Sequence, residues 1–238
     1  MNERAIAAGL SALAQYIGIV IAMLLTPALV GSDPASPGYG SGFDSMLWIY
    51  AVISITATIL FFIVIREKPE GVLFEKGERV PFIKGVKHIT ALRDMRITIL
   101  LFLIGLGIFN AVSSLTDSIA ESMGVKDSDG LIGGFMLIGG IIGAIIIPLL
   151  SDFYRKRRIF LVICLAGMVP GIAGLTFAPH LSHDAGQVYN IALAASFILG
   201  FFVMSAGPIG FQYAAEVSYP APESASQGIL LWVGQLTG

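Results

Sequence analysis

Three amide side chains stand out because each interrupts a long apolar run. Gln15, Asn110 and Gln235 lie among hydrophobic residues, far from one another along the chain. An amide in hydrocarbon costs roughly 2–7 kcal/mol when it has no hydrogen-bond partner, so each is expected to meet another polar group. Two interpretations stay open at this point: the amides line a cavity for a polar solute, or they form hydrogen bonds between helices.

A short charged turn forms the second chemically distinctive group. The stretch 151–158 (SDFYRKRR) places one acid, Asp152, before four bases and between two apolar runs. Bases alone would serve as a membrane anchor, but an anchor does not explain the acid. An acid beside bases can lock neighbouring helix ends through charge pairs and helix dipoles. We therefore expect Asp152, Arg155 and Arg157 to form a gate, closed against the helix start near Glu3.

Two further acids lie at the ends of apolar runs. Asp117 is near the outer end of one run, and Glu216 is near the inner end of another. Charged groups are tolerated at membrane boundaries far better than at the midplane. These positions indicate interfacial caps or gate residues rather than proton carriers, and we assign Glu216 to the gate.

The sequence carries no enzyme signature. His180 and His183 lie near Asp184, but a third ligand at metal-binding spacing does not follow. A phosphate-binding loop, a nucleophile–His–acid order and paired catalytic carboxylates are likewise missing from the sequence. We expect neither enzyme activity nor a metal or other cofactor.

The composition indicates that this chain is embedded in lipid. Of its 238 residues 55% are hydrophobic and 13% charged, and the mean hydropathy is +0.84. Soluble domains have about 45–50% apolar and about 25% charged residues, so a soluble core cannot bury this excess. One cysteine and a net charge of −2 exclude a disulfide scaffold and a nucleic-acid binder.

Six charge-free runs are long enough to cross a bilayer as helices, which takes about 20 residues. They are Ala5–Ser32, Ser45–Ile65, Ile97–Thr116, Gly130–Ser151, Ile159–Pro179 and Ala185–Ala215. A seventh run begins after Glu223 and is cut off at Gly238. Because the runs are apolar on every face, helices are favoured over barrel strands. The prediction is an all-α membrane protein with six complete transmembrane helices and a truncated seventh.

The basic residues are sorted to one side of this layout. Of the 14 Lys and Arg residues, one is Arg4, eight lie in Arg66–Arg96 and four in Arg155–Arg158, and only Lys126 falls elsewhere. The positive-inside rule then predicts a cytoplasmic N-terminus for this chain. The expected location is the plasma membrane or the cytoplasmic membrane of a bacterium or archaeon.

The long basic connector contains a stretch with helical periodicity. Val80–Arg93 is expected to form a short amphipathic helix, which would lie on the membrane surface or serve as a plain tether. Its apolar residues on one face are Phe82, Ile83, Val86, Ile89 and Leu92.

The two ends of the chain resemble each other. Without a gap, residues 3–18 align with 223–238, so that Glu3 meets Glu223 and Gln15 meets Gln235. Such internal repeats are typical of transporters. The alignment predicts two equivalent six-helix halves and a chain that is incomplete at both ends. Residues 1–65 would be the last two helices of the first bundle, 66–96 a cytoplasmic linker, and 97–238 an incomplete second bundle.

Small residues and prolines mark packing and bending sites within the runs. Gly139 and Gly143 have the small-xxx-small spacing that permits close helix contact. Gly207-Pro208 is the best hinge candidate, since proline removes a backbone donor.

The layout and the charged turn resemble the major facilitator superfamily, whose signature loop carries an Asp followed by bases. Here Pro148 stands where a Gly is common, and Lys156 replaces the second Gly of the loop. Three stretches look like the feline leukaemia virus subgroup C receptor family of haem and choline transporters. They are ERA (3–5) with LLTPALV (24–30), GIFNAVSSL (107–115), and EVSYPAPE (216–223) followed by Gly228 and Gln235.

That resemblance implies helices five to eleven of a twelve-helix carrier that works by alternating access. In the family, aromatic residues and glutamines line a central cavity for a quaternary amine. Gln235 and Phe109 match two of these positions, Asn110 stands where a tyrosine is expected, and Tyr16 aligns with a glutamine, one residue after Gln15. These five residues are the candidate substrate-binding set.

The implied partners are a small organic solute and the bilayer, and the complete protein is expected to be a monomer that binds no nucleic acid. Haem, choline or a related amine or metabolite is the substrate that the resemblance suggests. The alternative is a multi-helix receptor or scaffold that transports nothing, although a cytoplasmic N-terminus is opposite to the usual receptor orientation.

Overall fold

A computed structural model describes residues 14–15, 17–22, 25–26, 28–31, 38, 40–64, 81–127 and 130–236. The chain divides into two compact units, and the described residues up to 64 belong to one and those from 81 onward to the other. Each unit is considered by itself.

The first unit contains the long helix α2, Phe43–Val64, and shorter helical stretches before it, such as 17–22 and 28–30. The hydroxyls of Thr26 and Tyr50 are 2.6 Å apart and tie the two parts together. Helix α2 matches the second expected span. Most of the first expected span, Ala5–Ser32, lies outside the described residues.

The second unit consists of helices in the part of the chain that is described. They are α3 (Phe82–Ala91), α4 (Arg93–Ser114), α5 (Thr116–Ser122), α6 (Leu131–Tyr154), α7 (Arg157–Leu181), α8 (Ala185–Val217) and α9 (Glu223–Gln235). Among the described residues, five helices are long and apolar enough to cross a membrane: α2, α4, α6, α7 and α8. These five confirm the second to sixth predicted spans, and α9 begins where the seventh was predicted.

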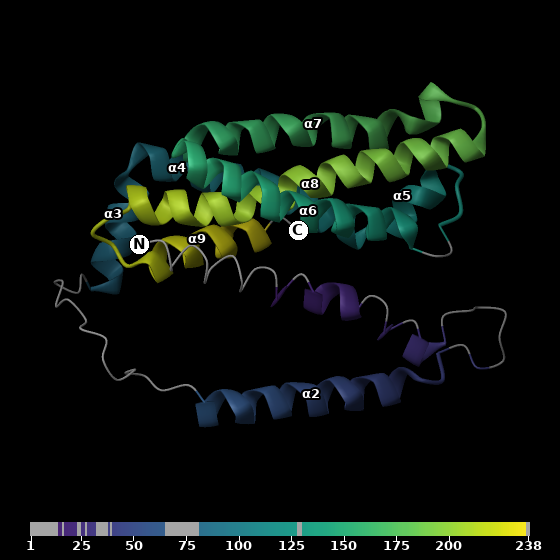
Figure 1. Cartoon of the computed structure of the whole chain (residues 1–238), viewed down its shortest axis with the longest axis horizontal. Helices are drawn as coiled ribbons and strands as arrows, with labels where there is room; N and C mark the ends of the chain where they lie inside the picture. The colour runs from purple at the N-terminus through teal and green to yellow at the C-terminus, as the bar shows by residue number, and fades with distance from the viewer. Residues whose placement is uncertain are drawn as a thin grey trace. The chain divides into compact units, whose positions relative to one another are not determined.

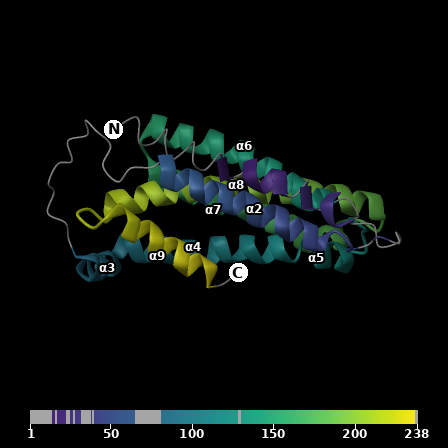
Figure 2. The same ribbon diagram turned by 90° about the horizontal axis from the view of Figure 1, so that it is seen from below.

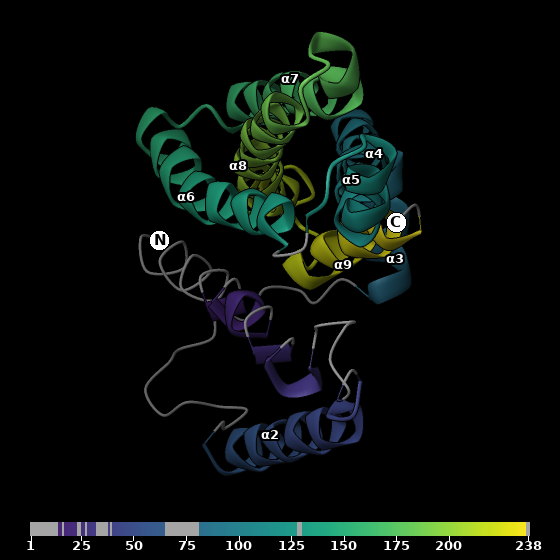
Figure 3. The same ribbon diagram turned by 90° about the vertical axis from the view of Figure 1, so that its right-hand side faces the viewer.

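Helix α8 is the centre of the second unit. It packs along both α6 and α7, and it also contacts α4 and α9, so that α6 and α7 flank it when the unit is viewed end-on (Figures 1 and 3). The apolar cluster between these helices includes Met136, Met168, Ala192 and Leu199, all buried. On the outside, Leu149, Val162 and Val169 are 56–65% exposed, as expected for side chains that face lipid.

The approach of α6 to α8 depends on glycine. A Cβ at Gly139 or Gly143 would overlap the backbone of Phe197 or Phe201 in α8, and one at Gly200 would overlap the backbone of Met136. This confirms the predicted role of the Gly139–Gly143 pair in close packing. Helix α8 continues through Gly207-Pro208 up to Val217.

A second group of helices gathers at the start of α4. Helix α9 packs along α4, and the short helix α3 contacts both (Figure 2). Ile89 of α3 is fully buried there with Met95, Ala225 and Leu230.

The predicted helix over Val80–Arg93 is confirmed by α3, but its faces differ from the expectation. Gly85 and Ile89 are buried, because this side of α3 packs against the segment before α9. Phe82 and Ile83, expected on the same face as Ile89, are 67% and 70% exposed. Periodicity alone placed all the apolar residues together, whereas the contact with the segment before α9 covers Gly85 and Ile89 and leaves the first turn of α3 uncovered.

Candidate functional site

Two of the predicted amides meet in the structure. Asn110, in the last two turns of α4, donates a hydrogen bond from Nδ2 to Oε1 of Gln235 at the end of α9, over 3.3 Å. The residues are 125 positions apart in the sequence. At 1.5 Å per residue, Gln235 lies about 18 Å along its helix from Glu223, a distance shorter than the thickness of a hydrocarbon core, about 30 Å.

The seam between α4 and α9 positions the amide pair. Leu230 is fully buried in this seam, and one turn later a Cβ at Gly234 would overlap the side chain of Leu106. The absence of a side chain at Gly234 lets the two helices approach closely just before Asn110 and Gln235. The amides are therefore held by rigid helices rather than by loops.

Within the part of the chain that the structure describes, one side of the amide pair is open. Asn110 is half-buried and Gln235 is exposed, while Ser113, Ser114 and Asp117, which follow Asn110 at helical spacing, are also exposed. Residues three and four apart share a helix face, so Asn110, Ser113 and Ser114 form a polar stripe at the end of α4, and Asp117 follows in α5, which begins after Leu115. Amides and carboxylates are costly against lipid tails, and this stripe is therefore suited to a water-filled or ligand-filled cavity.

The other predicted cavity residues are not part of this pair. Phe109 is half-buried and packs against the apolar cluster of the second unit, on a different side of α4 from Asn110. Gln15 is exposed and belongs to the first unit, and Tyr16 lies outside the described residues.

The charged turn does bring predicted gate residues together. Arg157 Nη2, at the start of α7, lies 3.3 Å from Asp152 Oδ1 of α6 and 3.1 Å from Glu216 Oε1 of α8. Arg157 Nη1 also donates a hydrogen bond to Gln212 Oε1. The ion cluster formed by Asp152, Arg157, Gln212 and Glu216 thus connects the ends of three helices.

Each charge in the ion cluster opposes the dipole of its own helix. Asp152 and Glu216 are near the C-terminal ends of α6 and α8, where a negative charge is unfavourable, and Arg157 is at the N-terminus of α7, where a positive charge is unfavourable. The three charges become favourable only through one another. Their arrangement therefore depends on α6, α7 and α8 keeping these ends together.

The remaining gate candidates have different places. Arg155 forms the tight connection between α6 and α7, with a φ of 54°, in the left-handed region that favours glycine. Its side chain is exposed, and it forms none of the ion pairs seen among the described residues. Glu3 lies outside the described residues.

Sequence reasoning missed two polar contacts. Gln212 lies one turn before Glu216 on α8, and this i, i+4 spacing was a signal that both face the basic turn. At the opposite end of the unit, Asp127 accepts hydrogen bonds from the backbone of Leu131 and Ile132 and from Tyr189 Oη over 2.9 Å. Asp127 caps α6, but no local motif indicated its contact with α8.

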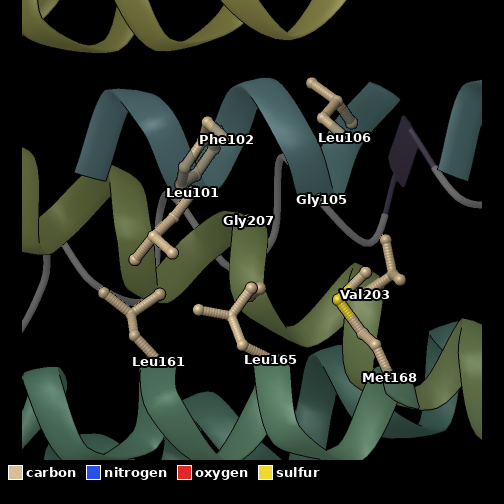
Figure 4. A pocket seen from close by; sticks show the side chains of 10 residues that line it. Leu101, Phe102, Gly105, Leu106, Leu161, Leu165, Met168, Val203 and Gly207 are labelled. Carbon is tan, nitrogen blue, oxygen red and sulfur yellow. The ribbon is translucent and has the colours of Figure 1, made fainter. Parts of the chain in front are cut away.

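A small apolar cavity lies between α4, α7 and α8 (Figure 4). Its volume is about 50 Å³, far below the roughly 300–1,000 Å³ of typical ligand pockets. Its lining residues are Leu101, Phe102, Gly105, Leu106, Leu161, Leu165, Met168, Val203, Ala206 and Gly207. These side chains are apolar, so this cavity is not a site for a polar solute.

Comparison with known proteins decides the family. The model of the Major Facilitator Superfamily matches residues 1–238. The chain belongs to this superfamily. An all-α fold that forms part of the superfamily's twelve-helix architecture is therefore confirmed.

Superfamily relatives include proteins with and without an assigned substrate. Solute carrier family 49 member A3 of Xenopus tropicalis is 29% identical over 100% of this chain and 48% of its own length. A choline/ethanolamine transporter of Rattus norvegicus is 25% identical over 100% of the chain and 44% of its own length. An uncharacterised protein of Archaeoglobus fulgidus is 30% identical over 71% of the chain and 73% of its own length.

These relatives agree with the resemblance expected from the three sequence stretches. The chain spans about half the length of the solute carrier and choline/ethanolamine relatives that it matches. Membership of the superfamily points to a membrane transporter rather than an enzyme.

Proposed function

We propose that the complete protein is a secondary transporter that moves a small organic solute across the membrane by alternating access. In this proposal, residues 1–65 belong to one helical bundle and 97–238 to a second, with 66–96 as a cytoplasmic linker. The substrate passes between the bundles, and the complete protein works as a monomer.

The amide pair is the observation that carries the proposal. Asn110 and Gln235 are hydrogen-bonded to each other, and the open side of the pair continues into the polar stripe at the end of α4. Contact between such a polar surface and hydrocarbon is unfavourable, whereas contact with a solute that has hydrogen-bonding groups is favourable. The proposed binding set is completed by Gln15, Tyr16 and Phe109.

The ion cluster supplies the proposed gate. Asp152, Arg157 and Glu216 join three helix ends at the basic side of the second unit, which we place at the cytoplasmic face. Arg155 and Glu3 complete the gate in this proposal. Alternating access requires such contacts to form on one side while the other side opens, because the cavity cannot be open to both.

The proposed substrate class is a small amine or a related metabolite. Support comes from the relative in rat that is named as a choline/ethanolamine transporter. Asn110 provides an amide where the resemblance places an aromatic ring. A binding site with fewer rings gains less from a cation–π contact and more from hydrogen bonds, which favours a primary amine such as ethanolamine over a quaternary one.

Uptake into proteoliposomes tests the proposal. The complete protein is reconstituted, and entry of radiolabelled choline and ethanolamine is compared with entry into protein-free liposomes. Protein-dependent, saturable uptake is expected. Asn110→Ala combined with Gln235→Ala is expected to reduce uptake about 5- to 150-fold, because two hydrogen-bonding groups are removed, each of which contributes about 0.5–1.5 kcal/mol.

Thr176→Ala is the matched control variant. Thr176 is exposed on α7, and among the described residues its hydroxyl bonds only to the backbone carbonyl of Ile172 in its own helix. Uptake by this variant should equal that of the unaltered protein. Normal uptake by the double amide variant would remove the pair from the mechanism, and absence of uptake of any amine would favour the receptor or scaffold alternative.

A further inference from the structure

We propose that α3 is an interfacial anchor, which binds anionic lipid headgroups with its lysines and inserts Phe82 and Ile83 at the edge of the hydrocarbon. In this proposal, the exposed apolar side chains of α3 contact the lipid surface at the basic end of the second unit. This proposal concerns the membrane contact alone and does not depend on transport.

The two sides of α3 have different surroundings. Ile89 is fully buried, and a Cβ at Gly85 would come within 3.3 Å of Pro222 and 3.7 Å of Ala221. This side fixes α3 to the segment that leads into α9. Phe82 and Ile83, on the first turn, are 67% and 70% exposed. Phe82 shares the side of Ile89 but lies a turn nearer the start of α3 than Gly85, and Ile83 is about 120° around the helix from Ile89, so this contact leaves both large apolar side chains exposed.

Lysines lie beside this apolar pair. Lys84 and Lys87 are exposed, and they form none of the ion pairs seen among the described residues. On a helical wheel Lys87 lies about 40° from Ile83, and Lys84 lies about 140° from Ile89, on the far side of the helix. An amphipathic helix with large apolar side chains next to lysines is the arrangement that binds at the headgroup boundary.

The location of α3 agrees with a lipid surface. Tyr213, near the end of α8, bonds to Asp94 at the start of α4, and Arg157 pairs with Glu216, so these helix ends and α3 are at one end of the unit. Further exposed bases at this end are Arg93, Arg96, Arg155, Lys156 and Arg158. A positive rim complements anionic headgroups, and the exposed apolar residues beside it fit the acyl boundary.

Site-directed spin labelling tests the proposal in the complete protein. Labels are attached to Phe82→Cys, Ile83→Cys and, as a position on the polar side, Lys84→Cys. Cys164 is 0% exposed and stays in place, and the unaltered protein controls for its labelling. Collision rates with oxygen and with a water-soluble nickel chelate are measured in nanodiscs of phosphatidylcholine alone or mixed with phosphatidylglycerol.

Labels at 82 and 83 are expected to meet oxygen more than the nickel chelate, and label 84 is expected to do the opposite. Phosphatidylglycerol should increase the inserted fraction at 82. Lys84→Gln and Lys87→Gln, each made with label 82, should lower the ratio of inserted to free label about fivefold per lysine. Lys126→Gln, an exposed lysine at the opposite end, should leave the ratio unchanged.

Two results would overturn the proposal. Equal access of the nickel chelate to labels 82 and 83 in both lipid mixtures would mean that α3 is a solvated tether. Poor access of both reagents would mean that another part of the protein covers these residues. Elution volume and thermal unfolding are measured for each variant to show that the compared proteins are folded. Neither the two collision rates nor these folding controls depend on uptake.

Discussion

Arg157 at the start of α7 lies 3.1 Å from Glu216 near the end of α8, although these residues are 59 positions apart in a chain of otherwise apolar helices (157 to 216). The contact joins a cation at a helix N-terminus to an anion at a helix C-terminus. Since both positions are unfavourable for the charge that occupies them, the pair stabilises a particular packing of helix ends more than either helix alone.

Neutralising Arg157 should therefore cost more than neutralising either acid. Arg157→Gln leaves Asp152 and Glu216 at helix C-termini without their cation, whereas Glu216→Gln leaves Arg157 paired with Asp152. With side chains 22% and 57% exposed, the Arg157–Glu216 coupling should be about 0.5–1 kcal/mol, measured by a double-mutant cycle of thermal unfolding in the complete protein. Additive effects of the two substitutions would contradict the coupling.

The sequence was sufficient to predict most of the described helices and part of the candidate site. Apolar runs predicted five helices that the structure contains, because a bilayer forces helical structure on any long apolar segment. The sequence did not single out Gln235 as the partner of Asn110, since an amide in an apolar run requires a hydrogen-bond partner but does not identify it. Phe109 is one residue, or 100° of helix, from Asn110, and the sequence did not indicate that this half-buried ring packs against the apolar cluster.

The ion cluster shows the same limit in another form. Asp152 was expected to act with Arg155 and Arg157, because the sequence did not distinguish between these two bases. The choice of Arg157 follows from the turn itself, which uses Arg155 in a left-handed conformation and ends before α7 begins. That geometry, like the contact of Tyr189 with Asp127, depends on the tertiary packing and has no local sequence signal.

Two glycine substitutions, one on α6 and one on α8, should test the close contact between these helices. Gly143→Ala places a methyl group against the backbone carbonyl of Phe201, which cannot move without shifting α8. We expect a loss of about 1–3 kcal/mol, seen as a lower midpoint of thermal unfolding. Gly207→Ala is the matched control, because nothing lies within 4 Å of its Cβ, and its midpoint should be equal to or above that of the unaltered protein. Equal midpoints for both variants would contradict the close α6–α8 contact.

Removal of the Asp127 carboxylate should loosen the end of the unit opposite the ion cluster. Asp127→Ala deletes the acceptor for two backbone N–H groups of α6 and for Tyr189. A lost helix cap costs about 0.5–2 kcal/mol, and the side-chain hydrogen bond adds about 1 kcal/mol. Tyr189→Phe, which removes only one hydroxyl, should cost less than half as much. Hydrogen exchange at Leu131 and Ile132 should increase in Asp127→Ala, and unchanged exchange there would rule out the cap.

Asn110→Tyr should change which amine the protein prefers. A ring at this position adds a face for a quaternary ammonium, worth about 0.5–2 kcal/mol, so the apparent KM for choline should fall about two- to thirtyfold relative to that for ethanolamine. Asn110→Leu is the matched control, since it removes the hydrogen bond to Gln235 without adding a ring, and it should weaken uptake of both amines. Competition between the two labelled amines in proteoliposomes measures the preference directly. If Asn110→Tyr and Asn110→Leu give the same ratio of uptake, then residue 110 does not face the substrate, and the open side of the amide pair has another role.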